Sequence, residues 1–340
     1  MIVLKMEEAA KRKQIIQFSN LRILLLVIFS FIFSAVYAQQ QELVFRTGLY
    51  AKKAWFSVSP DGKLIVFSTD KISQGTRLLD LTSGKISVLL SEPSQTFGFP
   101  AWSPDGRHIV LQSAEMRGGK YDLDRMEIVL FDSSTGQQKS ISVGEGIKFS
   151  PFFSADGKIV YYFKGQKRES GKTPGSRYDL YAIELASRKE ARLTHEEFYQ
   201  AAKGDDSKSS VLFNATPNFA KSIKDEFRQP SRNALFLYEK DTAKVSIVPI
   251  DQSSGIFDFY SPQRDKTGSF YFVAAKNRPG GGNYLWFLIR TNSEGKRAEV
   301  LAELPISMKF DIAQKTGEIF VTDIADEELI FRRLRISAAY

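Results

Sequence analysis

Residues 101–111, AWSPDGRHIVL, decide the fold. A Ser-Pro-Asp-Gly segment separates two short apolar segments. Proline presets the backbone angle that opens a tight turn, aspartate accepts hydrogen bonds from the backbone that follows, and glycine supplies a positive φ. The flanking residues are aromatic, aliphatic or β-branched, as is typical of strands. The stretch therefore predicts a β-hairpin.

The same pattern recurs at residues 56–67, FSVSPDGKLIVF, and at residues 152–162, FFSADGKIVYY. Its turn glycines, Gly62, Gly106 and Gly157, are 44 and 51 residues apart. A second pair of strand-like segments follows each hairpin, as in TRLLDLTSGKISVLL after the first. Each repeat therefore holds four strands, A to D, with tight A–B and C–D turns.

Three weaker copies follow, at residues 210–213, 267–273 and 316–321. From Gly62 to Gly317 there are 255 residues, or five intervals that average 51. A four-stranded unit at this period is typical of a β-propeller. We therefore predict an all-β, six-bladed propeller whose blades are four-stranded antiparallel sheets.

The hairpins and their continuation DLTSG at residues 80–84 resemble the WD40-like (PD40) repeats of TolB-type propellers. The resemblance covers about residues 43–340 and is most specific over the first three units. It implies a six-bladed propeller, often periplasmic, that usually acts as a protein-binding scaffold.

The sixth unit contains strand-like segments for A, B and C, at residues 308–312, 318–322 and 329–336, and then the sequence ends. Residues 43–46 are a lone strand-like segment before the first hairpin. We predict that this segment supplies the missing D strand, because closing the ring removes an edge that would otherwise invite aggregation. The alternative is a leader without regular structure.

Residues 1–38 are predicted to be a signal peptide that forms a helix. Five basic residues precede the apolar run 23–33, and the small residues Val36 and Ala38 occupy the −3 and −1 positions for cleavage after Ala38. The run is shorter than the roughly 20 residues of a membrane span, so cleavage is favoured, and an uncleaved anchor is the alternative. The propeller domain is then residues 39–340, in the periplasm or secreted.

Charge and cysteine content agree with an exported chain. The formal net charge is +8, and it falls to about +5 when the five basic and two acidic residues of the export segment are removed. The sequence contains no cysteine, which excludes disulfides and attachment through a cysteine-linked lipid.

The B–C connections are long and individual, whereas the turns on the opposite face are short and uniform. Long, individual loops on a rigid scaffold usually carry binding. Two of them are rich in basic residues, which we predict to contact a partner; solvated loops are the alternative. Acidic residues in the D–A connections of the same face offset this charge and argue against nucleic acid. The predicted contact residues are Lys164, Lys167, Arg168, Lys172, Arg177, Lys221, Lys224 and Arg228.

Catalytic signals are weak. The sequence has two histidines and no Ser-His-Asp spacing, phosphate-binding loop or paired-histidine metal spacing. Matching Ser261-Pro262 to the turn Ser103-Pro104 aligns Asp258 with Asp311 on adjacent innermost strands, and His195 lies in a D–A connection. Two adjacent carboxylates can share a proton or hold a cation. The alternative is that they accept hydrogen bonds from the backbone of a neighbouring blade.

The sequence thus favours an exported, non-enzymatic, monomeric scaffold without a cofactor or metal. It is expected to bind an envelope or secreted protein, or a glycan, through its long-loop face, and to contact a membrane only through an uncleaved export segment. The alternative is a propeller hydrolase or lyase, or a glycan-binding protein, with a site at the channel mouth formed by Asp258, Asp311 and His195.

Overall fold

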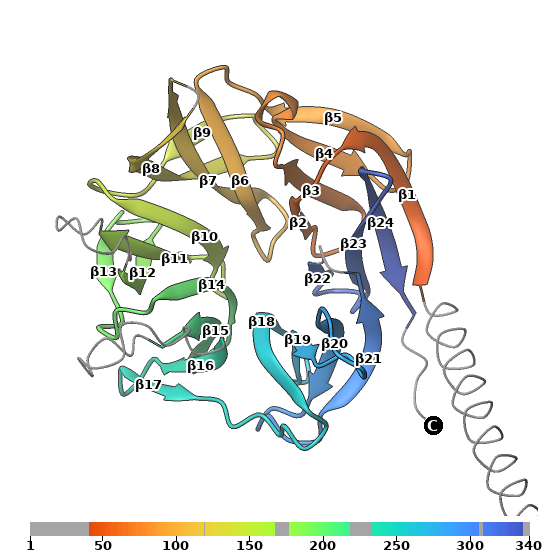
Figure 1. Cartoon of the computed structure of the whole chain (residues 1–340). Coiled ribbons are helices and arrows are strands. Elements are labelled where there is room, and N and C mark those ends of the chain that lie inside the picture. The colour runs from red at the N-terminus through yellow and green to blue at the C-terminus, as the bar shows by residue number, and fades with distance from the viewer. Residues whose placement is uncertain (1–40, 119, 167–176, 218–232, 306–308, 336–340) are drawn as a thin grey trace, which may run out of the picture.

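The computed structural model describes residues 41–335, except 119, 167–176, 218–232 and 306–308. Within these residues, 24 strands form six antiparallel sheets of four strands each. The sheets are arranged as blades around a central channel (Figure 1). The predicted six-bladed propeller is confirmed. The predicted signal peptide lies outside the described residues.

Blades 1 to 3 each use four consecutive strands. They are β2 (Ala54–Val58), β3 (Leu64–Thr69), β4 (Thr76–Asp80) and β5 (Lys85–Leu90); β6 (Gln95–Trp102), β7 (His108–Arg117), β8 (Lys120–Asp132) and β9 (Gln138–Ser140); and β10 (Ile147–Phe153), β11 (Ile159–Gln166), β12 (Arg177–Glu184) and β13 (Glu190–Arg192). A short 3-10 helix, η1 (Ile72–Gln74), lies between β3 and β4.

Blades 4 and 5 follow the same rule, and blade 6 adds the first strand of the chain. They are β14 (Gln200–Asp206), β15 (Ser210–Thr216), β16 (Ala234–Glu239) and β17 (Lys244–Ile247); β18 (Ile256–Arg264), β19 (Phe270–Lys276), β20 (Leu285–Thr291) and β21 (Glu299–Leu304); and β22 (Phe310–Ile312), β23 (Ile319–Ala325), β24 (Glu328–Leu334) and β1 (Gln41–Tyr50).

Strand β1 closes the ring, as predicted, and is longer than the four residues expected. It pairs antiparallel with β24, from Gln41 opposite Leu334 to Tyr50 opposite Glu328. Figure 1 shows the two strands side by side at the junction of blades 6 and 1. The ring itself therefore has no open end.

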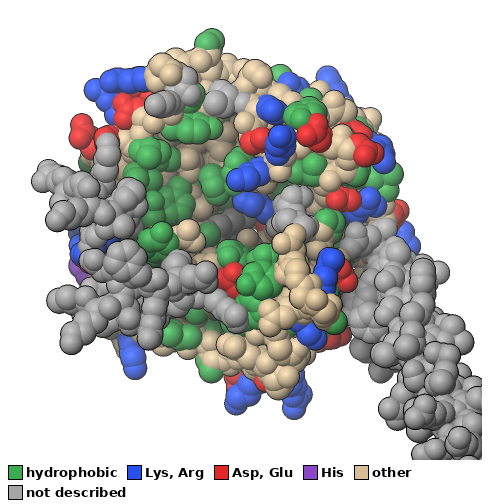
Figure 2. All heavy atoms as spheres, viewed as in Figure 1, with side chains coloured by type: hydrophobic (Ala, Val, Ile, Leu, Met, Phe, Trp, Pro, Cys, Tyr) green, Lys and Arg blue, Asp and Glu red, His purple; other side chains and the backbone are tan. Residues whose placement is uncertain are grey.

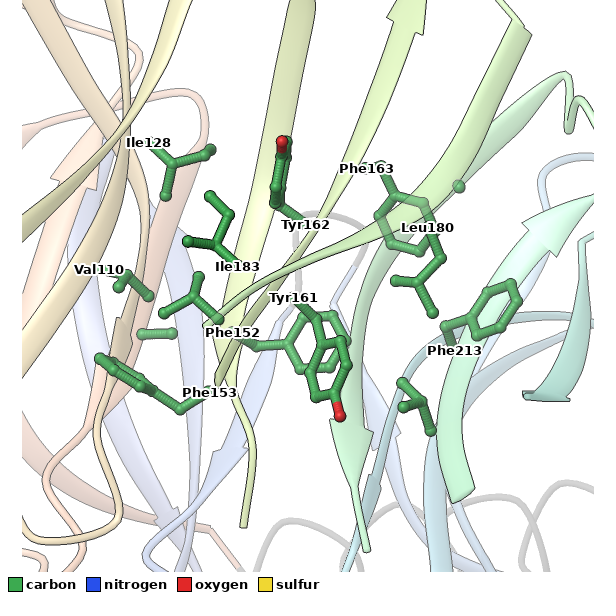
Figure 3. Close-up of a cluster of buried hydrophobic side chains, with 14 of the residues drawn as sticks. Val110, Ile128, Phe152, Phe153, Tyr161, Tyr162, Phe163, Leu180, Ile183 and Phe213 are labelled. Carbon is green, nitrogen blue, oxygen red and sulfur yellow. The ribbon is translucent and has the colours of Figure 1, made fainter. Parts of the chain in front are cut away.

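The first strand of each blade lies innermost and meets the first strands of the neighbouring blades. Blades pack on one another through alternating side chains, so each sheet is buried on both faces. In blade 3, Tyr162 points toward Ile128 of blade 2, while Phe163 points toward Phe213 of blade 4, with ring centroids 5.6 Å apart (Figure 3). This aromatic packing makes the largest buried cluster, across blades 2 to 4.

The repeated turns form as the sequence predicts. In blade 2 the amide of Ser103 donates to the carbonyl of His108 at 2.8 Å, and the amide of Gly106, at a φ of 78°, donates to the carbonyl of Ser103. The carboxylate of Asp105 accepts the amide of Arg107 at 2.9 Å. In blade 5 the corresponding turn begins at Asp265, whose amide donates to the carbonyl of Ser269, so this turn is one residue shorter than that of blade 2. The turn of blade 4, in which the amide of Ser207 donates to the carbonyl of Ser210, is shorter still. The degraded copies therefore change the length of the turn as well as its residues.

We call the face with the A–B and C–D turns the turn face, and the face with the B–C and D–A connections the loop face. Two connections on the loop face are more regular than predicted. The expected loop 115–125 is the far part of the β7/β8 hairpin, in which Met116 pairs with Tyr121. The B–C connection of blade 6 is only Asp326–Glu327, both at positive φ.

Candidate functional site

At its turn end the channel contains a cavity of about 230 Å³ that residues from the innermost strands of all six blades line. One register position, two residues before the start of each A–B turn, recurs around this cavity. Its occupants, in blade order, are Ser57, Ala101, Phe152, Asp205, Gln263 and Asp311. We call it the stitch position, because four of its six side chains bond to the next blade.

In each of these four, a side-chain oxygen accepts the amide hydrogen one register position further along the next innermost strand. Asp311 Oδ2 accepts from Val58 at 2.7 Å, which joins blade 6 to blade 1. The other three bonds are Ser57 Oγ from Trp102 at 3.3 Å, Asp205 Oδ2 from Arg264 at 2.6 Å, and Gln263 Oε1 from Ile312 at 3.1 Å. At the remaining two junctions Ala101 and Phe152 pack in the largest apolar cluster instead.

Blade 4 carries the most charged part of this cavity. The carboxylate of Asp206 pairs with Lys240 at 2.7 Å and accepts the amide of Ala155 at 2.9 Å. Asp205 is partly accessible from the cavity, yet protein atoms crowd around it, and this burial raises the pKa of Asp205 to about 6, against the opposing effect of Arg264. Burial in turn lowers the pKa of Arg264. The charges are arranged to hold neighbouring strands together.

Asp258 and Asp311 are at opposite ends of the channel, so the predicted alignment of the two was wrong. Ser261-Pro262 belongs to a bulge in β18 that corresponds to Phe99-Pro100 in β6, where the residue before proline also has a positive φ. Proline suits a bulge because it has no amide hydrogen to donate to the ladder. Asp311 is therefore the counterpart of Gln263, and Asp258 lies five residues earlier in its strand, roughly 15 Å further along the channel.

Asp258 holds the loop end of the junction between blades 4 and 5. It accepts the backbone amide of Asn233 at 2.8 Å, the side-chain amide of Asn233 at 3.0 Å and the hydroxyl of Tyr260 at 2.9 Å. His195 is exposed, three residues after the outer strand β13. The three residues proposed for a channel-mouth catalytic site are thus spread over both ends and the periphery of the propeller.

A residue that the sequence did not single out anchors the connection that contains His195. Asp179 is buried in β12 and accepts hydrogen bonds from Thr194 Oγ1 at 2.8 Å and from the amide of Glu196 at 3.0 Å. It also pairs with Arg192 at 2.7 Å. The only available signal was an aspartate inside the apolar stretch YDLYAI.

Two of the predicted partner-binding residues are described, and both make internal ion pairs. Lys164 Nζ lies 2.8 Å from Glu190 and donates to the carbonyl of Val143 at 3.0 Å. Arg177 pairs with Glu197. Lys164 and Arg177 lie in β11 and β12, at the base of the third B–C connection. The other six lie outside the described residues: Lys167, Arg168, Lys172, Lys221, Lys224 and Arg228.

Within the described ranges, no three His, Asp or Glu side chains gather closely enough to hold a metal ion. The same residues include no helix with the length and hydropathy that a membrane span requires.

The loop face differs from the turn face in its exposed side chains. Of the large hydrophobic residues that are exposed in the described chain, none lies in an A–B or C–D turn. Four lie in outer strands, namely Leu43, Val88, Ile247 and Tyr50. Tyr50 ends β1 where the chain reaches the loop face, and five more lie on that face: Tyr121, Leu123, Val143, Tyr199 and Tyr284.

An aromatic pair joins two adjacent innermost strands on their loop side. Trp55 and Phe99, from these strands, have ring centroids 5.0 Å apart, and Lys309 Nζ lies over both rings at 5.0 and 5.2 Å. Tyr260 and Trp286 make an edge-to-face pair at 5.6 Å and pack against the apolar cluster of blades 5 and 6. In the view of Figure 2, hydrophobic side chains gather around the central hollow, while many charged side chains lie toward the rim.

Solved structures give the likeness that the repeats predict. A putative TolB from Agrobacterium tumefaciens superposes with a TM-score of 0.58 at 16% identity, over 86% of this chain and 93% of that one. TolB from Acinetobacter baumannii gives 0.51 at 14% identity over 84% of this chain, which spans only 64% of the Acinetobacter protein. Oligogalacturonate lyase from Vibrio parahaemolyticus gives 0.52 at 10% identity, over 83% and 77% of the two chains.

No family model matches the sequence, and no curated protein sequence matches it. At such low sequence identity, these structural matches establish the fold alone, which is a TolB-like six-bladed propeller. The same fold occurs in the lyase, so the fold alone does not choose between binding and catalysis.

Proposed function

We propose that this chain is an exported, non-enzymatic propeller scaffold that binds an envelope or secreted protein through its loop face. One observation carries the proposal: exposed large hydrophobic side chains occur on the loop face and in outer strands, and in none of the described turns. Four of the six on the loop face are tyrosines. Tyrosine and tryptophan are the residues that most often dominate protein–protein binding energy.

The distribution of charge supports binding over catalysis. The carboxylates of Asp205, Asp206 and Asp311, which line the cavity at the turn end, all bond to strands or side chains of the channel wall. Asp258 is committed to Asn233 and Tyr260 in the same way. A catalytic pair needs convergent groups within hydrogen-bond reach of one reacting atom. The proposed acid and base candidates are instead dispersed.

Export is proposed from the sequence of residues 1–38. It also supplies the partner class, because an exported propeller without a nucleic-acid-binding face meets envelope and secreted proteins. The six basic residues beyond the described ranges are proposed to add electrostatic steering at the same face, which raises association rates more than affinity.

The test compares two triple variants in a cross-linking capture from envelope extract. In the first, Tyr50, Tyr199 and Tyr284 on the loop face become serine. In the second, a matched control, Leu43, Val88 and Ile247 in the outer strands become serine. All six side chains are at least 42% exposed, so both variants are expected to fold.

We expect the loop-face variant to lose a captured protein that the wild type and the control variant retain. A third variant that lacks residues 167–176 tests the basic loop, and we expect it to slow capture. If both triple variants capture the same proteins as the wild type, the loop face is not the binding surface and the proposal fails.

A further inference from the structure

The turns of the turn face carry an excess of basic side chains. The six A–B and five C–D turns, all of which the structure describes, contain eleven basic and seven acidic residues. The described parts of the connections on the loop face contain five basic and eight acidic residues. Within the described chain, the turns are therefore positive and the opposite connections negative.

The basic residues of the A–B turns are arranged as a ring. Each of the six A–B turns contributes one exposed basic side chain, and these are Lys63, Arg107, Lys158, Lys208, Lys266 and Lys315. An A–B turn joins the innermost strand of a blade to the second strand. The six side chains therefore surround the turn end of the channel, where Pro60, Pro104 and Gln314 line the cavity.

Four of these six cations are available to a partner. Arg107 pairs with Asp132 at 3.0 Å, and Lys63 lies 3.9 Å from the aspartate of its own turn. The other four form no ion pair with any residue that the structure describes: Lys158, Lys208, Lys266 and Lys315. The carboxylate of Asp156 accepts a serine hydroxyl at 2.7 Å and a backbone amide at 3.1 Å of its own turn. Such short acidic side chains stay at the turn backbone, whereas the lysines are exposed.

The first strand of the chain enters the propeller at the same face. Gln41 begins β1 opposite Leu334, which ends β24 at the turn face, and Glu42 pairs with Arg335 at 2.8 Å. The other end of β1, at Tyr50, reaches the loop face roughly 30 Å away, at about 3.3 Å per residue. A membrane that holds the predicted export segment is therefore nearest to the turn face.

We propose that the turn face binds the surface of a membrane rich in anionic phospholipid, and that the loop face then points away from this membrane. The four available lysines lie in blades 3 to 6, and each lysine near an anionic surface strengthens binding about fivefold. None of the exposed large hydrophobic residues of the described chain lies in a turn, so the contact is electrostatic and does not insert into lipid. The inference is independent of the partner at the loop face and adds a membrane contact beyond the export segment.

The test measures which face of the full-length chain lies nearer to lipid. The sequence contains no cysteine, so Ala186→Cys and His195→Cys each introduce a single site for a fluorescent label. Both residues are exposed and belong to blade 3, opposite blade 6 in the ring, with Ala186 in the C–D turn and His195 in the loop-face connection. The vesicles are phosphatidylcholine alone or an equal mixture with phosphatidylglycerol, and they carry a nitroxide quencher on the headgroups.

On the mixed vesicles, quenching of the label at residue 186 should be at least about twice that at residue 195, because the two faces are roughly 30 Å apart. The difference should shrink on phosphatidylcholine alone. It should also shrink when the salt concentration rises from about 0.1 to 0.5 M, since salt screens exposed charges.

Two quadruple glutamine variants isolate the charges. The first replaces the four available lysines and should abolish the difference between the two labels. The second is a matched control that replaces basic residues exposed at the loop face and should keep the difference: Lys52, Lys53, Lys276 and Arg278. Both variants change exposed side chains only, so both are expected to fold, and their melting temperatures check this.

Equal quenching of the two labels on the mixed vesicles overturns the proposal, as does quenching of neither. A difference that survives in the first quadruple variant also overturns it. If the chain binds alginate, a soluble acidic polysaccharide, but not the mixed vesicles, the turn face takes an acidic glycan and the proposal is wrong. Failure of the proposed function is separate, because the capture experiment changes none of the four available lysines.

Discussion

The two ends of the central channel use the same six strands for opposite purposes. At the turn end, polar side chains such as Asp311 and Gln263 bond to the backbone of the next blade, and the turns themselves are internally satisfied. At the loop end, the aromatic rings of Trp55 and Phe99 pack together beneath the amino group of Lys309. The side chains of the turn end hold the blades together, and those of the loop end are proposed to contact a partner.

The fate of the two candidate carboxylates shows why this distinction matters. Asp258 and Asp311 look alike in the sequence, and both lie on innermost strands. Their positions along the channel separate them, so neither can take a proton from the other. A pair of carboxylates in a propeller is therefore meaningful only after the bulges of the inner strands have been located.

The largest effect on stability is expected from Asp311→Ala, which breaks the bond between blades 6 and 1. The variant leaves the amide of Val58 without an acceptor in a buried position. Losing a hydrogen bond to a charged acceptor costs about 1.5–3 kcal/mol. Urea unfolding of the two proteins measures the loss, with Asp241→Ala in the exposed turn between β16 and β17 as the control. A change below about 0.5 kcal/mol would show that the bond does not hold the ring.

A pH-dependent effect is expected from Asp205, because burial raises its pKa from 3.8 to about 6. The folded state binds this proton more tightly than the unfolded state. The resulting stability is fully present below pH 4 and is lost as the pH rises through 6. Asp205→Asn should therefore gain stability relative to the wild type between pH 4 and 7, by about 1–3 kcal/mol.

Thermal unfolding over that pH range measures the difference, and comparison at each pH removes the effects of other groups. A constant difference between the two proteins from pH 4 to 7 would contradict a raised pKa for Asp205.

A smaller effect is expected from Ser57→Ala, which removes a neutral acceptor at the equivalent position. Its bond to the amide of Trp102 is 3.3 Å long, the longest of the four. We expect a loss of about 0.5–1.5 kcal/mol in urea unfolding. Ala101, at the same position in blade 2, shows that an apolar residue is tolerated where the neighbouring blade packs by aromatic contacts. If Ser57→Ala lost more stability than Asp311→Ala, the expected order of the two variants would be wrong.

Much of the fold could be predicted because it rests on local chemistry that repeats. The turns at Ser59, Ser103 and Ser154 need only neighbours in sequence, and their spacing, extended through the three weaker copies, gives six blades. Closure of the ring by residues 43–46 was predicted because the sixth unit lacks a fourth strand. The far part of the β7/β8 hairpin, residues 115–125, was expected to be a loop, since its polar residues obscure the strand pattern.

The candidate site was harder to predict from the sequence, because it depends on which residues of different blades contact one another. The stitch position is two residues before each turn, but bulges at Pro100, Pro151 and Pro262 shift the register of the inner strands. The Ser261-Pro262 pair of blade 5 was therefore matched to an A–B turn, although it lies in the bulge of β18. The contacts of Trp55, Phe99 and Lys309 at the loop end join residues of different blades, and no single stretch of sequence contains them.

The most direct test of the central claim measures stability and partner capture on the same two variants. Asp311→Ala at the turn end should lower the urea midpoint and, under conditions where it is folded, capture the same protein as the wild type. The triple serine variant of Tyr50, Tyr199 and Tyr284 should keep the wild-type midpoint and lose capture. The loop-face variant could instead unfold at a lower urea concentration than the wild type, or the Asp311 variant could lose capture while folded. Either result would contradict the claim that the turn end provides stability and the loop end provides binding.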